Sequence, residues 1–234
     1  MQLQGGRNMG INRRVEKLIN SWVKFLQTYS LPQEVEPLQV KSIQKHSHKF
    51  YASDVFTCYT YRIHRRIQSP ALYKNDKLLK RMKIGQIVHE VLQEVAQELN
   101  FQSEVNVEGE HIKGKIDLLD PRTNSIIEIK TTMRKQPTEY MLRKHYGQLY
   151  TYKHLLESHT GEAYDIYLIY CIIQPWGFDI QLFPNNNDDL MLYVLQDWTE
   201  AIEEWYKYQK TQRIEPEFSY ACKNCEYRNA CFKL

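Results

Sequence analysis

Two carboxylates and a lysine lie in one stretch of the sequence at spacings that suit metal chemistry. Glu128 and Lys130 are two residues apart, so they share one face of a predicted strand, and Asp117 lies on the strand before it. A hairpin would bring Asp117 next to Glu128. Adjacent carboxylates repel unless a cation lies between them, and oxygen ligands suit Mg²⁺ or Mn²⁺. A nearby ammonium would orient water or offset charge on a phosphate, so the set predicts a phosphodiesterase centre.

Three further polar residues on predicted helices strengthen this interpretation, since a Glu-x-Lys pair alone more often marks a solvated strand face. His89 lies at the edge of the apolar stripe of a helix at 84–99, where a neutral imidazole could be a third metal ligand. Gln148 and Tyr152 are four residues apart on one face of a helix at 138–158. They could hydrogen-bond a phosphate or the lysine, although Tyr152 could also simply pack in the core.

Four of the five cysteines form a candidate metal site. Cys222, Cys225 and Cys231 follow a C-x₂-C-x₅-C pattern, and Cys58 is the best fourth donor, whereas Cys171 lies in an apolar strand and is predicted to be a core residue. Four thiolates suit a [4Fe–4S] cluster or Zn²⁺. A usual structural zinc site has two C-x-x-C pairs, and this chain has one, which favours the cluster.

The composition is ordinary for a globular protein of 234 residues, with 42% hydrophobic and 25% charged residues. The net charge of +3 does not by itself indicate a nucleic-acid partner. The first residues lead into no apolar segment, and no apolar run is long enough to span a bilayer, so we expect a cytoplasmic protein with no membrane partner. In that compartment clustered cysteines are better interpreted as metal ligands than as disulfides.

The elements that must position these residues follow from hydrophobic periodicity. Helices are predicted at 11–29, 53–66 (with Ser53 as N-cap), 84–99, 138–158 and 187–211, and strands near 104–111, 112–119, 125–131, 164–174 and 177–183. This order predicts a mixed α/β core followed by a short cysteine-rich tail.

These motifs resemble a known family. Gly85 and His89 on a helix, Gly-x-x-Asp117, Glu128-x-Lys130 and Gln148-x-x-x-Tyr152 are similar to the RecB-type branch of the PD-(D/E)XK nuclease superfamily. With one cysteine before this core and three after it, residues 50–234 resemble the CRISPR-associated RecB-like iron–sulfur exonuclease family, which has virus-encoded homologues.

The resemblance implies a restriction-endonuclease-like mixed sheet flanked by helices, plus a small helical, cysteine-bearing iron–sulfur lobe. The implied parts are an N-terminal helix and connector (1–50, a potential interaction arm), a nuclease core to which Cys58 belongs (51–214) and the cysteine segment (215–234). His89, Asp117, Glu128 and the carbonyl of Ile129 would bind Mg²⁺ or Mn²⁺, Lys130 would be the catalytic lysine, and Gln148 and Tyr152 accessory residues. Cys58, Cys222, Cys225 and Cys231 would hold a [4Fe–4S] cluster.

The implied activity is a DNA exonuclease that acts at DNA ends, prefers single strands and serves CRISPR spacer acquisition or viral or host DNA processing, with CRISPR integrase proteins as partners. Two alternatives remain open: a non-catalytic DNA-binding adaptor of such an integrase, and a zinc-containing nuclease of the same superfamily. Candidate phosphate contacts are Arg62, Arg65, Arg66, Lys77, Lys80, Arg81, Lys83, Arg134, Lys135, Arg143 and Lys144. Cleavage polarity and oligomeric state stay open.

Overall fold

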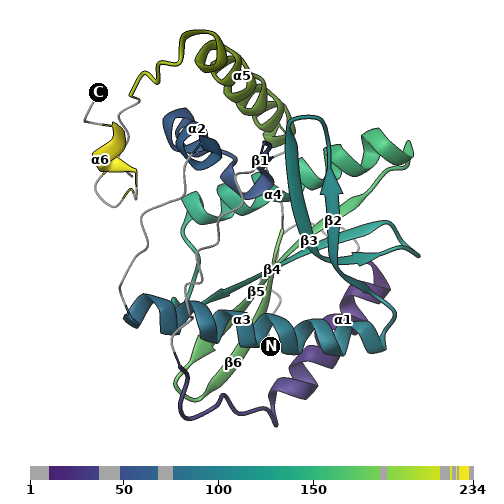
Figure 1. Cartoon of the computed structure of the whole chain (residues 1–234). Coiled ribbons are helices and arrows are strands. Elements are labelled where there is room, and N and C mark those ends of the chain that lie inside the picture. The colour runs from purple at the N-terminus through teal and green to yellow at the C-terminus, as the bar shows by residue number, and fades with distance from the viewer. Residues whose placement is uncertain are drawn as a thin grey trace.

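A six-stranded mixed sheet lies between two layers of helices in the computed structural model (Figure 1). The structure describes residues 11–36, 48–67, 76–184, 189–216, 222, 225 and 227–231. The helices are α1 (Arg13–Leu26), η1 (Ala52–Asp54), α2 (Tyr59–Ile67), α3 (Asp76–Glu98), α4 (Glu139–Thr160), α5 (Leu190–Thr211) and α6 (Arg228–Cys231). The strands are β1 (Phe50–Tyr51), β2 (Gln102–Glu108), β3 (Ile112–Asp120), β4 (Ser125–Thr132), β5 (Asp165–Gln174) and β6 (Gly177–Phe183). The predicted mixed α/β class is confirmed.

Strands β3 and β4 pair for only a short distance before they separate. Their antiparallel register runs from Leu118 opposite Ile127 to Asp120 opposite Ser125. Beyond that point β3 pairs with β2 on its other side, while β4 continues parallel to β5 as far as Thr132. The two strands therefore form a fork, and the first residue of β3 past the last paired position is Asp117.

Each face of the sheet carries its own hydrophobic cluster. On one side α1 and α3 pack on apolar residues of β3 to β6, and Ile127, Ile129 and Cys171 all lie in this cluster. On the other side α4 and α5 cover a second cluster that includes Tyr152 and Trp198. The predictions that Ile127 and Ile129 point into a core, and that Cys171 is a core residue, are confirmed by their complete burial.

Helix α4 has well-defined ends, which fixes the position of its polar residues along the sheet. The hydroxyl of its N-cap, Thr138, accepts a hydrogen bond from the amide of Met141 at 3.3 Å. Its C-cap is Gly161, which adopts the left-handed conformation at φ 71°. The helix agrees closely with the predicted range 138–158 and is anchored at both ends.

Two predicted helix boundaries are wrong. The helix predicted at 53–66 is split, because Phe56 has a positive φ of 56° that ends the 3₁₀ turn η1 and delays α2 until Tyr59. Cys58 therefore precedes α2 instead of lying inside it. Helix α3 starts at Asp76, well before the predicted start at residue 84. The prediction missed this part because the residues between are mostly charged and carry no apolar period. None of the described helices combines the length and apolar character that crossing a bilayer requires.

Candidate active site

Asp117 occupies the fork between β3 and β4 and replaces a missing backbone partner. Past the end of the β3–β4 ladder, the amide of Ile129 has no carbonyl opposite it on β3. Oδ2 of Asp117 accepts that hydrogen bond at 2.8 Å, so the carboxylate is held beside the next residues of β4. This confirms the predicted closeness of the two acidic strands and shows that the fork positions the carboxylate.

Glu128 is a buried carboxylate that lacks a full set of partners. It is 1% exposed, its Oε1 accepts a hydrogen bond from Nζ of Lys130, and its Oε2 has no partner among the described residues. Burial, followed by the nearby charge of Asp117, raises the pKa of Glu128 to about 8. A buried carboxylate oxygen without a donor is well suited to a cation, because a cation would relieve both causes of the shift.

Lys130 lies beside Glu128 on the same face of β4, as predicted, and links it to α4. Its side chain is 24% exposed, and its Nζ is 3.3 Å from Oε1 of Gln148. Burial lowers the pKa of Lys130, but the charges of Glu128 and Asp117 outweigh this effect, so the net shift of the pKa is upward. Lys130 is therefore a cation that reaches solvent from an acidic pocket.

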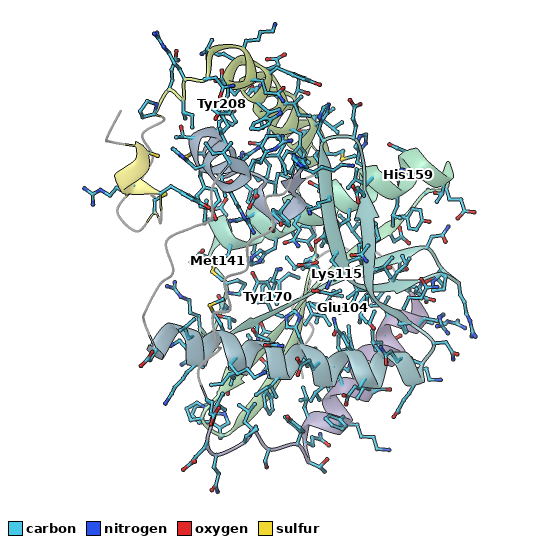
Figure 2. All side chains as sticks on the ribbon, viewed as in Figure 1. Glu104, Lys115, Met141, His159, Tyr170 and Tyr208 are labelled. Atoms are coloured by element: carbon cyan, nitrogen blue, oxygen red, sulfur yellow. The ribbon has the colours of Figure 1, made fainter. Side chains whose placement is uncertain are left out.

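Gln148 and Tyr152 form a chain of hydrogen bonds behind the lysine. Nε2 of Gln148 donates to the hydroxyl of Tyr152 at 2.7 Å, and that hydroxyl donates to the carbonyl of Lys115 on β3 at 2.8 Å. Tyr152 also lies in the hydrophobic cluster under α4, so its ring packs in the core while its hydroxyl serves the polar chain. Figure 2 shows Lys115 and Tyr170 in the region between α4 and α3.

His89 reaches the fork from α3. Its Nδ1 lies 3.9 Å from Oδ1 of Asp117, and its side chain is 25% exposed. Burial lowers the pKa of His89 against the opposing effect of Asp117, which favours the neutral imidazole that a metal ligand must be. Helix α3 comes close to β4 at Gly85, where an added Cβ would be 2.8 Å from the hydroxyl of Thr131. Gly85 thus permits the approach that carries His89 to the fork.

The predicted ligands are neighbours, but their present positions do not form a complete metal site. Among the described residues, no group of three or more His, Cys, Asp or Glu side chains is arranged to hold a metal ion. The reason at the fork is that Lys130 occupies one oxygen of Glu128 and the amide of Ile129 occupies one oxygen of Asp117. The free Oε2 of Glu128 and the Oδ1 of Asp117 are left as oxygen donors, a set that fits Mg²⁺ or Mn²⁺.

A comparison of the sequence with models of protein families finds a match. Residues 94–232, more than half of the chain, match the family model described as the PD-(D/E)XK nuclease superfamily. The chain belongs to this superfamily. The match includes Asp117, Glu128, Lys130, Gln148, Tyr152 and the three C-terminal cysteines, and it begins after His89. A comparison with curated protein sequences finds no match.

Solved structures with a similar course of the chain include three proteins. They are SSO0001 (19% identity, TM-score 0.46, 93% of this chain and 96% of that one), a candidate exonuclease from Eubacterium rectale (14%, 0.49, 81% and 93%) and a phage-related exonuclease from Haemophilus somnus 129PT (11%, 0.39, 72% and 98%).

The four cysteines of the predicted cluster site do not form a metal-binding group among the described residues, although the three C-terminal ones lie near one another. Cys58 caps α2, because its sulfur accepts a hydrogen bond from the amide of Tyr61 at 3.3 Å. The amide of Cys225 is bonded to the carbonyl of Cys222 at 3.4 Å, and Cys231 ends α6. Burial, followed by the neighbouring Cys225 and Cys222, raises the pKa of the Cys231 thiol. The three C-terminal thiols are therefore close enough to influence one another.

An aromatic contact joins the cysteine segment to the helix that Cys58 begins. The ring of Tyr227 packs against the rings of Tyr61 and His64 of α2, with centroids 5.3 and 5.6 Å apart. Figure 1 shows α6 next to α2, at the end of the molecule away from α1. The cysteine segment therefore packs against α2 through Tyr227, and four cysteine thiolates, if brought together there, would suit an iron–sulfur cluster or zinc.

Two of the predicted DNA contacts, Arg62 and Arg66, are buried, and a third, Arg65, is partly exposed but engaged in an ion pair. Arg62 is fully buried and its Nη2 binds both carboxylate oxygens of Asp197, at 2.8 and 2.7 Å. Arg65 pairs with Asp54, and Arg66 is buried against two aromatic rings. These arginines hold α2 in place, and the sequence could not show that Arg62 meets Asp197, because the two lie 135 residues apart.

The remaining predicted contacts form two groups by exposure. The exposed side chains are Lys80, Arg81, Arg134, Lys135 and Arg143; Lys83 and Lys144 are partly buried; the Lys77 side chain lies outside the described residues. The exposed ones come from the start of α3, the connection after β4 and the start of α4. All three segments adjoin the end of β4 that carries Lys130.

Two residues beside the lysine were missed by the sequence reasoning. Nδ1 of His145 on α4 lies 2.6 Å from the hydroxyl of Tyr170 on β5. Tyr170 is directly opposite Lys130 in the parallel β4–β5 register. His145 precedes Gln148 by three residues, so helical spacing placed it on the same face, but nothing in the sequence indicated its partner.

Proposed function

We propose that this chain is a Mg²⁺- or Mn²⁺-dependent DNA exonuclease that acts at DNA ends and prefers single strands. The observation that carries the proposal is the buried Oε2 of Glu128, which lacks a described partner and lies beside Asp117 and Lys130. Membership of the PD-(D/E)XK nuclease superfamily supports a nuclease with DNA as its substrate. A buried carboxylate oxygen without a partner lowers the folding stability unless a bound cation coordinates it.

Each residue of the site has a proposed role. A bound divalent cation would supply Lewis-acid activation of water and neutralise charge at the scissile phosphate. Asp117, Glu128, His89 and the carbonyl of Ile129 would hold that cation. Lys130 would orient the attacking water, with Gln148 and Tyr152 fixing the position of its ammonium. The exposed basic residues around the end of β4 would contact phosphates of the strand.

The lysine gives the decisive test. Lys130→Ala should lower Mn²⁺-dependent cleavage of an end-labelled single-stranded oligonucleotide by about 10²-fold or more, because the charge near the phosphate is lost. Lys207→Ala is the matched control, since Lys207 lies on the far helix α5 and its ion-pair partners among the described residues are Glu204 and Glu215. Thermal unfolding of both variants separates a loss of chemistry from a loss of fold.

Full activity in Lys130→Ala would overturn the proposed site. Tight DNA binding by the wild-type protein without any cleavage in Mg²⁺ or Mn²⁺ would instead favour the non-catalytic adaptor. Shortening of the labelled strand one nucleotide at a time is expected for an exonuclease, and cleavage of a circular single strand would show endonuclease activity.

The proposal includes a structural [4Fe–4S] cluster on Cys58, Cys222, Cys225 and Cys231. The contact of Tyr227 with α2 supports it, because this contact brings the tail to the helix that Cys58 begins. Anaerobically purified protein should be brown and contain iron and labile sulfide, and Cys231→Ser should lose colour and melt at a lower temperature. Cys171→Ser, in the separate core cluster, is the matched control and should keep its iron.

A colourless protein that contains zinc would support the zinc alternative in place of the cluster and leave the nuclease proposal unchanged.

The resemblance to CRISPR-associated members extends the proposal to DNA processing for spacer acquisition with integrase partners. Co-purification with such an integrase, lost in Cys231→Ser, is the expected result, and no association under anaerobic conditions would remove this part of the proposal.

A further inference from the structure

Helix α4 presents a row of three polar side chains to three neighbouring strands. They are spaced by three and four residues, which places them on one face of the helix. The pairs, from the start of the helix onward, are His145 with Tyr170 of β5, Gln148 with Lys130 of β4, and Tyr152 with the carbonyl of Lys115 of β3. Two members of the row already belong to the proposed active site, and the third has no assigned role.

The row becomes more accessible toward His145. Tyr152 is 2% and Gln148 7% exposed, whereas His145 is only partly buried. The side chain of Lys130, next to it, also reaches solvent. A substrate that approaches Lys130 therefore meets His145 before it meets the buried members of the row. Figure 2 shows Met141 near the start of the same helix, four residues before His145.

The hydrogen bond to Tyr170 sets which ring nitrogen of His145 carries the proton. Burial, followed by the charges of Lys130 and Lys144, lowers the pKa of His145 to about 3, so the ring is neutral and has one N–H. Tyr170 is fully buried, and His145 Nδ1 is the acceptor available to its hydroxyl among the described residues. A buried hydroxyl needs an acceptor, so the phenol donates to Nδ1 and the ring proton stays on Nε2.

We propose that His145 is a substrate-contacting residue whose Nε2–H donates a hydrogen bond to a non-bridging oxygen of the phosphate that Lys130 faces. The inference rests on the proposed nuclease function. Among the described residues Nε2 has no hydrogen-bond partner, Tyr170 orients the ring, and the surroundings are positive because Lys130 and Lys144 both act on it. A neutral donor that lies near two cations favours an anion, and the anion in a nuclease is the DNA phosphate.

The competing role is an anchor, in which His145 only ties α4 to β5 through Tyr170. The two roles use different ring nitrogens, and two substitutions separate them. His145→Gln can place an amide N–H near the position of Nε2 but loses the acceptor at Nδ1. His145→Asn can place an amide oxygen near the position of Nδ1 but does not reach the substrate.

The experiment is single-turnover cleavage of a labelled oligonucleotide in Mn²⁺ by the full chain and its variants. His145→Gln should stay close to wild type, and His145→Asn and His145→Ala should each lose about 10- to 100-fold, as expected for a lost hydrogen bond to a charged group. Thermal unfolding should follow the opposite order, with His145→Asn closest to wild type. The anchor role predicts that cleavage also follows this opposite order, and that result would overturn the proposal.

A pH profile supplies a readout that a packing defect would not change. Because the ring is neutral throughout, the ratio of wild-type to His145→Ala rates should be constant from pH 6 to 9. A ratio that changes tenfold per pH unit would show a titrating acid or base and overturn the donor role.

If Lys130→Ala cleaves like wild type, the proposed function fails; if Lys130→Ala is inactive and all His145 variants are fully active, only this inference fails.

Discussion

At the scale of single residues, the site depends on a carboxylate kept in an unfavourable state. Glu128 is buried, adjoins a second carboxylate and has one oxygen without a described partner. A buried polar group left unsatisfied costs about 1–3 kcal/mol of folding stability. Lys130 offsets part of this cost through its hydrogen bond to Oε1. A cation bound beside Oε2 would remove the remaining cost, and this gain would strengthen the binding of the cation.

The affinity for metal should therefore depend on pH. Glu128 must be ionised to bind a cation, and in the metal-free protein its pKa is raised to about 8. Below that pH each unit should weaken Mn²⁺ binding about tenfold, because binding then has to displace a proton. Calorimetric titration between pH 6 and 8 in buffers of different ionisation enthalpy measures both the affinity and the released proton.

Glu128→Gln should bind Mn²⁺ weakly and with little pH dependence over this range. By the same linkage, the wild-type Glu128 carboxyl stabilises the metal-free fold at a pH below the pKa that it has in the unfolded chain. This stabilisation is lost as the pH rises toward 8, the pKa of the group in the folded protein. The neutral variant should not lose that stability. A wild-type affinity that stays constant from pH 6 to 8 would contradict the raised pKa.

At the scale of elements, the close packing of α4 over β3 depends on Gly114. Gly114 lies under the ring of Tyr152, so an added Cβ would overlap the ring carbon Cε1 and come within 3.1 Å of the Cβ of Ala52. The bare backbone at this position lets α4 lie close enough for Tyr152 to bond the carbonyl of Lys115. The glycine of the Gly-x-x-Asp motif thus has a packing reason: it sets the height of α4 above the site.

Gly114→Ala should destabilise the protein by about 1–3 kcal/mol, as overpacking does, and also reduce cleavage because Tyr152 and Gln148 are displaced. Gly109→Ala is the matched control, since its new Cβ would crowd the flexible end of Leu155, at 2.8 Å, and lie at an ordinary contact distance of 3.8 Å from the carbonyl of Ile112. Urea unfolding and the oligonucleotide assay should both place Gly114→Ala well below Gly109→Ala. Equal effects of the two substitutions would refute the packing role.

At the scale of the whole molecule, the N-terminal helix is part of the core. Val15, Leu18 and Trp22 are fully buried in the cluster shared with α3, and the indole of Trp22 donates to the carbonyl of Leu92 at 2.8 Å. Arg14 pairs with the buried Asp120 at the turn between β3 and β4. The apolar side of α1 packs in the core, so any partner of this helix would have to use its charged side.

Trp22→Ala should cost about 3–5 kcal/mol of folding stability, the usual range for removing a large core side chain. Phe25 lies on the same helix but is 37% exposed, so Phe25→Ala should cost much less. Denaturant unfolding monitored by circular dichroism compares the two. A small effect of Trp22→Ala would mean that α1 is not needed by the core and would favour a separable N-terminal arm.

The sequence by itself determined the order and kind of the longer helices and strands and named most of the residues that meet at the candidate site. Periodicity is a property of a local stretch of chain, so the strands around Asp117 and Glu128 and the helix of Gln148 and Tyr152 were predictable. The same pattern placed Lys130 beside Glu128 and Cys171 in the core. Helix starts were less predictable, because a single positive φ at Phe56 and a charged first turn of α3 leave no periodic signal.

Only the tertiary structure decided which groups meet across the fold. The fork that aims Asp117 at the amide of Ile129 depends on how far two strands pair, and the burial of Arg62 depends on Asp197, which lies 135 residues away. The bond between His145 and Tyr170 likewise joins a helix to a strand that follows it. Such contacts arise from long-range packing, which a local pattern does not encode, and they turned a common strand motif into a defined site.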